Sequence, residues 1–216
     1  MPESQSAVFR LRPLEPGDFT QMAGWFENVA DLARFDRSAR APFNATRVQA
    51  TWEPAADAAI NPTKCWFAIN AESGELCGVS GLESISAVNR DAVIALFIDE
   101  HWRRQGIGIR SMALVLDFAF RQIGLNRVTS FYRADNTRSQ QMTSRAGFTT
   151  EGRMREAWFA EGRYYDMVSV GLLRREWETR RKTLAGDLDA ACSASFRGAA
   201  VSGWAWPPGP QDPPEG

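Results

Sequence analysis

The middle of the chain joins a continuous apolar run to a stretch of helical periodicity. Residues 92–98 are apolar at every position, which predicts a strand buried on both faces. Between Ile109 and Ile123 apolar residues recur at helical spacing, and charged residues occupy the other side of the helix. Gly124 is expected to end that helix, and residues 127–132 are expected to form the next strand. Such a strand–helix–strand unit predicts a right-handed parallel crossover.

Apolar–polar alternation and turn residues predict the elements on either side of this unit. Strands are expected at residues 8–14, 63–70, 76–82, 153–159 and 164–172. Helices are expected at residues 19–28, 46–60, 136–146 and 174–183, with Asp18 as an N-cap, Pro54 as a kink and Gly147 as a stop. Residues 31–44 are expected to be irregular. The predicted fold class is α/β in the mixed α+β sense, with antiparallel strands added to the parallel pair and helices on both faces of the sheet.

The composition divides the chain into one domain and a tail. Residues 1–185 contain all the predicted elements. Residues 186–216 are rich in Ala, Ser, Gly and Pro and lack periodicity, so this tail is expected to be disordered. Docking of Trp204 and Trp206 onto the domain is the alternative for this segment.

Charge and residue counts exclude several classes of protein. The 25 Lys and Arg residues balance 26 Asp and Glu, so neither nucleic acid nor a membrane surface is an expected partner. The longest apolar run, 92–98, is too short to span a membrane, and the N-terminus lacks a secretory pattern. Cys65, Cys77 and Cys192 form no CxxC pair, and His101 is the single histidine, placed for a surface role. A cytoplasmic protein without a metal site is therefore expected.

A glycine-rich turn, Arg103-Arg104-Gln105-Gly106-Ile107-Gly108, lies between the predicted strand and helix. Glycines let a ligand approach the backbone closely, and the first helical turn offers unpaired amides at the positive end of the helix dipole. A pyrophosphate is therefore a suitable ligand. The turn lacks the Gly-Lys pair of a Walker A loop and the third glycine of a dinucleotide fingerprint. Arg103, Arg104 and Arg110 would add positive charge around it. The alternative is a tight turn surrounded by solvated arginines.

With these segments in order, the chain resembles the GNAT superfamily of acyl-CoA-dependent N-acetyltransferases, over about residues 8–180. Within that superfamily it is similar to the RimJ/RimL-like branch. The glycine-rich turn matches the family's pyrophosphate loop, and Asn136-x-x-Ser139-x-x-Met142 matches its Asn-led helix. The other matching segments are Leu125-Asn126-Arg127-Val128, Ala146-Gly147-Phe148, Glu151-Gly152-x-x-Arg155-Glu156, Gly162-x-Tyr164-x-Asp166 and Leu172-Leu173-x-x-Glu176-Trp177.

The resemblance implies a GNAT-type sheet whose parallel strand pair splays apart to admit acetyl-CoA, the acyl donor. The amides of residues 104–109 would bind the pyrophosphate, and the edge formed by Phe97 and Ile98 would pair with the pantetheine arm. Asn136 would bond the pantetheine or the thioester, with a helix N-cap as its alternative role. The CoA-binding residues that the resemblance implies are Phe97, Ile98, Arg103, Arg104, Gln105, Gly106, Ile107, Gly108, Ile109, Asn136 and Ser139.

Acetyl transfer to an amine requires a base, an oxyanion donor and an acid. An alkyl amine with a pKa of about 10.4 arrives protonated. The resemblance implies a carboxylate base, for which Glu83 and Asp91 are the candidates and a solvated loop position is the alternative. A backbone amide near Ile98 would stabilise the oxyanion. Thr143 stands where many members carry a tyrosine acid, so Ser139 is the candidate acid, as in the RimL-like branch, with a simple surface position as its alternative.

The predicted function is acetyl-CoA-dependent N-acetylation by direct attack of a primary amine on the thioester. The acceptor is a protein N-terminus or a small-molecule amine. Aromatic residues that could wall its site, or else belong to the core, are Trp25, Phe26, Phe35, Phe43 and Trp158. Edge-strand homodimers are frequent in the family, so a homodimer is a further expectation. The alternative function, motivated by the missing tyrosine at Thr143, is a catalytically inactive CoA-binding sensor or partner module.

Overall fold

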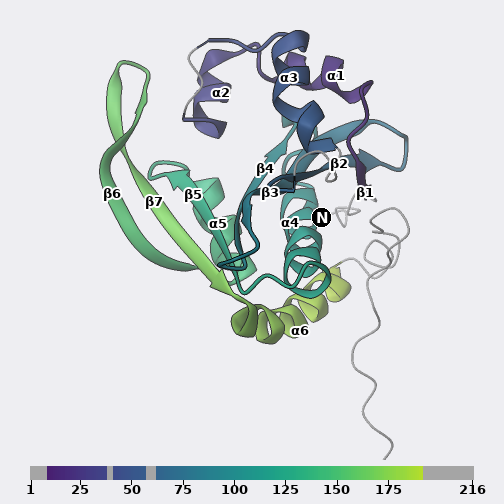
Figure 1. The fold of residues 1–216 in the computed structure, drawn as a ribbon, viewed down its shortest axis with the longest axis vertical. Coiled ribbons are helices and arrows are strands. Elements are labelled where there is room, and N and C mark those ends of the chain that lie inside the picture. Colours follow the sequence, from purple (N-terminus) through teal and green to yellow (C-terminus); the bar gives the residue numbers. More distant parts are fainter. Residues whose placement is uncertain (1–8, 38–40, 57–61, 192–216) are drawn as a thin grey trace, which may run out of the picture.

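The computed structural model describes residues 9–37, 41–56 and 62–191. In this part of the chain a seven-stranded sheet has the order β1-β2-β3-β4-β5-β7-β6 (Figure 1). Among the described strands only β4 and β5 are parallel neighbours, which confirms the predicted mixed, mostly antiparallel sheet. The strands are β1 (Phe9–Pro13), β2 (Cys65–Ala71), β3 (Leu76–Ser86), β4 (Asp91–Ile98), β5 (Arg127–Arg133), β6 (Thr149–Ala160) and β7 (Arg163–Leu173).

Helices cover both faces of the sheet, as predicted. The helices are α1 (Asp18–Trp25), α2 (Val29–Phe35), α3 (Ala45–Ala56), α4 (Ile107–Asp117), α5 (Thr137–Ala146) and α6 (Arg174–Ala191). In β2, Phe67 and Ile69 pack in the core cluster that includes α4, whereas Trp66 and Ala68 pack in the cluster that includes α1 and α3. Consecutive strand residues point to opposite faces, so these two clusters lie on opposite sides of the sheet. Figure 1 shows α1, α2 and α3 gathered at one end of the molecule and α6 at the other.

Two helix starts in the N-terminal part differ from the prediction. Residues 31–44 are not uniformly irregular, because α2 begins after Asn28, whose side chain caps its first turn. Asp18 is not the N-cap of α1; Gly17 occupies that position. The Asp18 carboxylate instead forms an ion pair of 2.6 Å with Arg12 of β1. A tertiary partner has therefore replaced the local capping bond that the sequence favours.

The central helix ends where predicted, whereas the C-terminal helix extends further. After Asp117, α4 continues as a π-helical turn, and the chain reverses at Gly124, whose φ of +72° suits a glycine. Helix α6 continues to Ala191, past the predicted boundary at residue 185. The rest of the tail, with Cys192, Trp204 and Trp206, lies outside the described residues. Within residues 9–37, 41–56 and 62–191, no helix combines the length and apolar character that crossing a membrane requires.

Strands β4 and β5 separate along their length, as the resemblance implies. Their parallel pairing runs from Asp91 to Val93 and then stops, although β5 remains paired with β7 as far as Arg133. A cavity of about 270 Å³ lies between the separated parts. Several of its lining residues on β4, including Leu96 and Ile98, are therefore only half-buried. Both faces of β4 nevertheless pack in core clusters, as predicted, with Ile94 on the α4 side and Phe97 on the opposite side. We call the gap between residues 94–98 and β5 the seam.

Candidate active site

The cavity in the seam, which we call the donor cavity, brings together five of the eleven residues predicted to bind CoA. Its walls come from β4, β5, the start of α5 and the turn before α4. The predicted residues among its lining are Phe97, Ile98, Arg103, Asn136 and Ser139. Sequence reasoning missed the lining residues Leu96, which the separation of the strands exposes, and Arg138 and Met142, which α5 brings to the cavity.

The backbone direction of β4 determines which residues offer polar groups to the seam. The Ile94 carbonyl accepts a hydrogen bond of 3.3 Å from a serine of β5, whereas the Asp99 amide donates to β3 at 2.8 Å. Backbone polar groups alternate sides along a strand, so those of Leu96 and Ile98 face the seam. The polar groups of Phe97 face β3 instead. Of the predicted pair, Ile98 therefore has a backbone aimed at the seam, and Leu96 joins it.

The glycine-rich turn forms a concave backbone at the start of α4. Arg104 and Gly106 both have left-handed backbone angles, with φ of +65° and +74°. The amide of Arg110 is the first in α4 to reach a carbonyl four residues earlier, at 3.3 Å from the oxygen of Gly106. The amides that precede it therefore have no partner inside the helix. Such an arrangement of free amides suits an anion.

Arg110 is buried beneath this turn rather than solvated. Its side chain is 1% exposed and lies 4.9 Å from the ring centroid of Phe9. The guanidinium donates through Nε to the carbonyl of Gly106 and through Nη2 to that of Gln105, both at 3.2 Å. In a planar trans peptide the following N–H points away from the carbonyl, so the amides of Gly106 and Ile107 are directed to the opposite side. Arg110 thus positions the turn for an anion, a role that sequence reasoning missed.

Cationic side chains surround the entrance to the donor cavity. A shallow pocket there is lined by Glu100, His101, Arg103, Arg104 and Arg138. Arg103 also donates through Nε to the Ile98 carbonyl at 2.9 Å. The imidazole of His101 is exposed, and its Nδ1 lies 2.9 Å from Oδ1 of Asp99, a bond that raises the pKa of the histidine. His101 therefore lies at the surface, where its position in the sequence suggested.

Asn136 and Ser139 meet at the N-terminus of α5. The Asn136 side-chain oxygen accepts a bond of 3.1 Å from the Ser139 amide, so Asn136 caps the helix and also lines the donor cavity. Within the described chain the Ser139 hydroxyl has no hydrogen-bond partner. The Thr143 hydroxyl, by contrast, donates to the carbonyls of Ser139 and Gln140 at 2.9 and 3.2 Å. Of the two hydroxyls, only that of Ser139 is available to a ligand.

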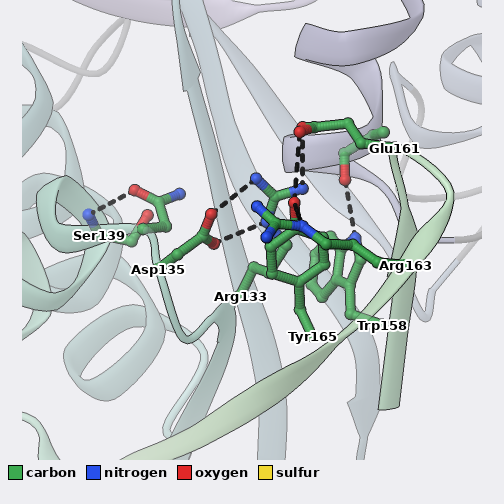
Figure 2. Close-up of polar contacts among 9 residues, drawn as sticks. Arg133, Asp135, Ser139, Trp158, Glu161, Arg163 and Tyr165 are labelled. Carbon is green, nitrogen blue, oxygen red and sulfur yellow. Dashed lines mark hydrogen bonds and ion pairs between the residues drawn. The ribbon is translucent and has the colours of Figure 1, made fainter. Parts of the chain in front are cut away.

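A buried arginine ties the β6–β7 hairpin to the residue before Asn136 (Figure 2). Arg133, 2% exposed, donates to Asp135 through Nε at 2.7 Å and Nη2 at 2.9 Å, and to Glu161 at 3.4 Å. Its guanidinium lies 4.0 Å from the ring centroid of Tyr165. The bond from Arg133 lowers the pKa of Asp135. The sequence gives no sign of this network, because it joins strand ends that meet only in the folded sheet.

A second cavity, of about 700 Å³, opens on the other side of the seam. We call it the acceptor chamber; it shares Phe35, Ile94, Ala95 and Phe131 with the donor cavity. Of the five predicted aromatic residues, three line it: Phe35, Phe43 and Trp158. Trp25 stacks on Phe97, with ring centroids 5.2 Å apart, and Phe26 is a core residue. Trp52 and Trp66 also line the chamber and were missed.

Trp158 closes the chamber by joining the β6–β7 hairpin to α2. Its indole Nε1 donates to the carbonyl of Ala33 at 2.7 Å, and Figure 2 shows the ring directed towards that helix. The register shifts between Met154 and Trp158, where a bulge bends β6. Bulges commonly redirect a side chain in this way.

The two candidate carboxylates lie in different places. Glu83 lines the acceptor chamber, and its Oε1 accepts bonds from Trp66 Nε1 at 3.2 Å and from Lys64 Nζ at 3.4 Å. Asp91 lies opposite Arg127, at the closed end of the seam, and lines neither the donor cavity nor the acceptor chamber. The fold therefore brings Glu83 to the site and leaves Asp91 apart from it.

A family model described as an acetyltransferase (GNAT) domain matches residues 9–149, which is more than half of the chain. The chain is 34% identical over 105 residues to the putative ribosomal N-acetyltransferase YdaF of Bacillus subtilis (strain 168), covering 49% of this chain and 57% of that protein. It is 31% identical over 93 residues to the ribosomal-protein-serine acetyltransferase of Escherichia coli (strain K12), covering 43% of this chain and 52% of that one. Both matches span less than two thirds of the relative's length.

A solved structure shares the fold as well. The crystal structure of spermidine N-acetyltransferase from Vibrio cholerae, in complex with CoA and spermine, has a TM-score of 0.71 and covers 79% of this chain and 98% of that one. The sequence identity is 19%, so this likeness speaks for the fold alone. The family match, the order of the motifs and the open seam agree with one another. The chain belongs to the GNAT acetyltransferase family, and its relatives include ribosomal-protein acetyltransferases.

Proposed function

We propose that this protein transfers an acetyl group from acetyl-CoA to a primary amine. The observation that carries the proposal is the seam between β4 and β5, which joins an anion-binding turn and a donor cavity to a separate chamber that contains a carboxylate. Family membership supports the same reaction. The two cavities would hold the two substrates on opposite sides of one opening, so that the amine reaches the thioester directly.

The donor side would hold acetyl-CoA through backbone groups. The pyrophosphate would bind the amides of residues 104–109, with Arg103, Arg104 and Arg138 around it. The pantetheine arm would pair with the seam-facing backbone of Leu96 and Ile98. Acetyl-CoA supplies an acyl group already activated as a thioester, so the protein needs no nucleophile of its own.

On the acceptor side, Glu83 would accept the proton that the amine must lose, directly or through water. Its carboxylate lines the chamber and is fixed by Trp66 and Lys64. A seam-facing amide of Leu96 or Ile98 would stabilise negative charge on the carbonyl oxygen. On the donor side, the unpartnered hydroxyl of Ser139 would pass a proton to the departing thiolate and regain one from water, so that no alkoxide is left. Base and acid would thus act from opposite sides of the seam.

Measurement of CoA release from acetyl-CoA in the presence of peptide N-termini, polyamines, amino acids and amino sugars tests the reaction. Glu83→Gln should lower kcat about 100-fold, the lower end of typical effects of an acid or base, while Asp91→Asn serves as the matched carboxylate control. Ser139→Ala should lower kcat similarly, with the exposed Ser144→Ala on the same helix as its control. Tight CoA binding without release on any amine would instead identify a non-catalytic CoA-binding module.

A further inference from the structure

The acceptor chamber has more cations than anions among its described lining residues. Its charged side chains are Asp36, Arg37, Arg47, Lys64 and Glu83. Three of them are positive and two are negative. A polyamine acceptor has several positive charges and would require a surplus of carboxylates here. The charges of this chamber are of the opposite sign.

The pairing of these charges leaves the surplus on two arginines. The Lys64 ammonium and the Glu83 carboxylate lie 3.4 Å apart and largely compensate each other. Asp36 has an interaction partner of its own and remains the one other carboxylate among the described lining residues. Arg37 and Arg47, by contrast, form no ion pair within the described chain. Two guanidinium groups that belong to no ion pair therefore remain at the chamber, against one carboxylate.

The contacts that these two arginines do make leave their charge in place. The Arg37 guanidinium touches the sulfur of Met167 at 4.0 Å. The Arg47 guanidinium lies 5.0 Å from the ring centroid of Phe43. Such contacts orient a guanidinium without neutralising it, so it can still bind a carboxylate or phosphate in a bidentate manner. Both arginines are exposed at the chamber, where a substrate can reach them.

Arg37 and Arg47 line the chamber but not the donor cavity, and most of the remaining chamber wall is apolar and aromatic. Phe35, Trp52 and Phe131 belong to this part of the lining. Glu83 is the carboxylate that approaches the amine in the proposed reaction. An acceptor that satisfies all these groups has three parts: an amine at the seam, an apolar body along the wall, and an anionic group at its far end.

We propose that the acceptor is a primary amine that carries a carboxylate or phosphate at the end of an apolar body, and that Arg37 and Arg47 select it. This inference rests on the proposed acetyl transfer and specifies the substrate class for the same chamber. It also distinguishes this protein from the Vibrio cholerae neighbour, whose complex contains spermine.

Three amines of equal length test the charge preference: 6-aminohexanoate, hexylamine and 1,6-diaminohexane. All three have six carbons, and they differ only at the sixth, which is a carboxylate carbon, a methyl group or a methylene that carries an ammonium. The expected order of kcat/KM for acetylation is aminohexanoate, hexylamine, diaminohexane, with about tenfold between the first and the last. Two short peptides with the same N-terminal residue, followed by acidic or basic residues, show whether the carboxylate belongs to a peptide or to a small molecule. A preference for diaminohexane would overturn the inference.

Charge-neutral variants identify the selecting residues. In Arg37→Gln/Arg47→Gln the ratio of kcat/KM for aminohexanoate over diaminohexane should fall about fivefold or more, because the cations that attract the carboxylate are gone. Arg121→Gln, an exposed arginine after α4, is the matched control and should keep the ratio. An unchanged ratio in the double variant would refute the role of the two arginines.

A binding measurement separates failure of the inference from failure of the proposed function. If no amine releases CoA, the acetyl transfer is refuted for these acceptors. Calorimetry of the three amines with the CoA-loaded protein then still decides the charge preference. Tighter binding of aminohexanoate supports the inference, and equal or tighter binding of diaminohexane overturns it.

Discussion

Replacement of Arg110 by methionine tests how the glycine-rich turn is held. Methionine keeps a long, flexible side chain against Phe9 but removes every donor of the guanidinium. The carbonyls of Gln105 and Gly106 lose their bonds of 3.2 Å, and the peptide planes that direct the Gly106 and Ile107 amides outward lose their support. We expect both the stability of the protein and its affinity for CoA to fall.

The two effects have different sizes. A hydrogen bond from a charged donor contributes about 1.5–3 kcal/mol, so the two bonds together contribute about 3–6 kcal/mol. Removal of a buried charge recovers part of its desolvation cost, and methionine refills part of the volume. The net loss in the free energy of unfolding should be about 2–3 kcal/mol. Disordered amides should weaken CoA binding roughly 10- to 100-fold, at about 1.4 kcal/mol for each factor of ten.

Denaturant unfolding measures the first effect and calorimetry with CoA the second. Arg110→Lys is the informative control, because it keeps the charge but cannot span both carbonyls with a planar fork. If charge alone mattered, the lysine variant would bind CoA like the parent protein; if positioning matters, it should resemble Arg110→Met. An Arg110→Met protein that is folded and binds CoA with the parental Kd would refute the reasoning.

Three further predictions concern the same site. At Gly108 an added Cβ would lie 3.4 Å from the Met142 sulfur, which is an ordinary contact, so Gly108→Ala should bind CoA within a few-fold of the parent. Gly108→Glu should abolish CoA binding, because its side chain is bulky and carries the same charge as the pyrophosphate. Calorimetry measures both affinities, and parental affinity in the glutamate variant would show that the turn does not bind the pyrophosphate. Because Asp99 raises the pKa of His101, its imidazolium persists to a higher pH than usual, and CoA affinity should decrease as the pH rises through that raised pKa. His101→Gln should remove this part of the pH profile of CoA binding. An identical pH profile in both proteins would show that the charge of His101 does not contribute to CoA binding. Arg133→Gln should release the β6–β7 hairpin and speed its amide hydrogen exchange about tenfold, while unchanged exchange would show that the hairpin is held elsewhere.

The order of elements and the glycine-rich turn before α4 follow from local chemistry and could be predicted from the sequence. The stripe from Ile109 to Ile123 predicts α4 because helical spacing is a property of neighbouring residues. Gly106 and Gly147 mark a helix start and a helix end, where their positive φ angles favour glycine. Asn136 caps α5 through its own side chain. None of these features depends on a distant part of the chain.

Only the tertiary structure determined which residues share the site. The separation of β4 from β5 after Val93 depends on how far two strands pair, and it decides that Leu96 faces a cavity. The choice of Glu83 over Asp91 depends on the same geometry, since both are carboxylates beside strands and only one lies at the chamber. The helical pattern places Arg110 on the polar side of α4, as for a surface cation. In the folded protein it is buried, and its guanidinium donates hydrogen bonds to two carbonyls of the glycine-rich turn. Sequence periodicity indicates which side of a helix or strand is apolar. Which residues of other elements face that side in the folded protein depends on pairings between residues far apart in the chain.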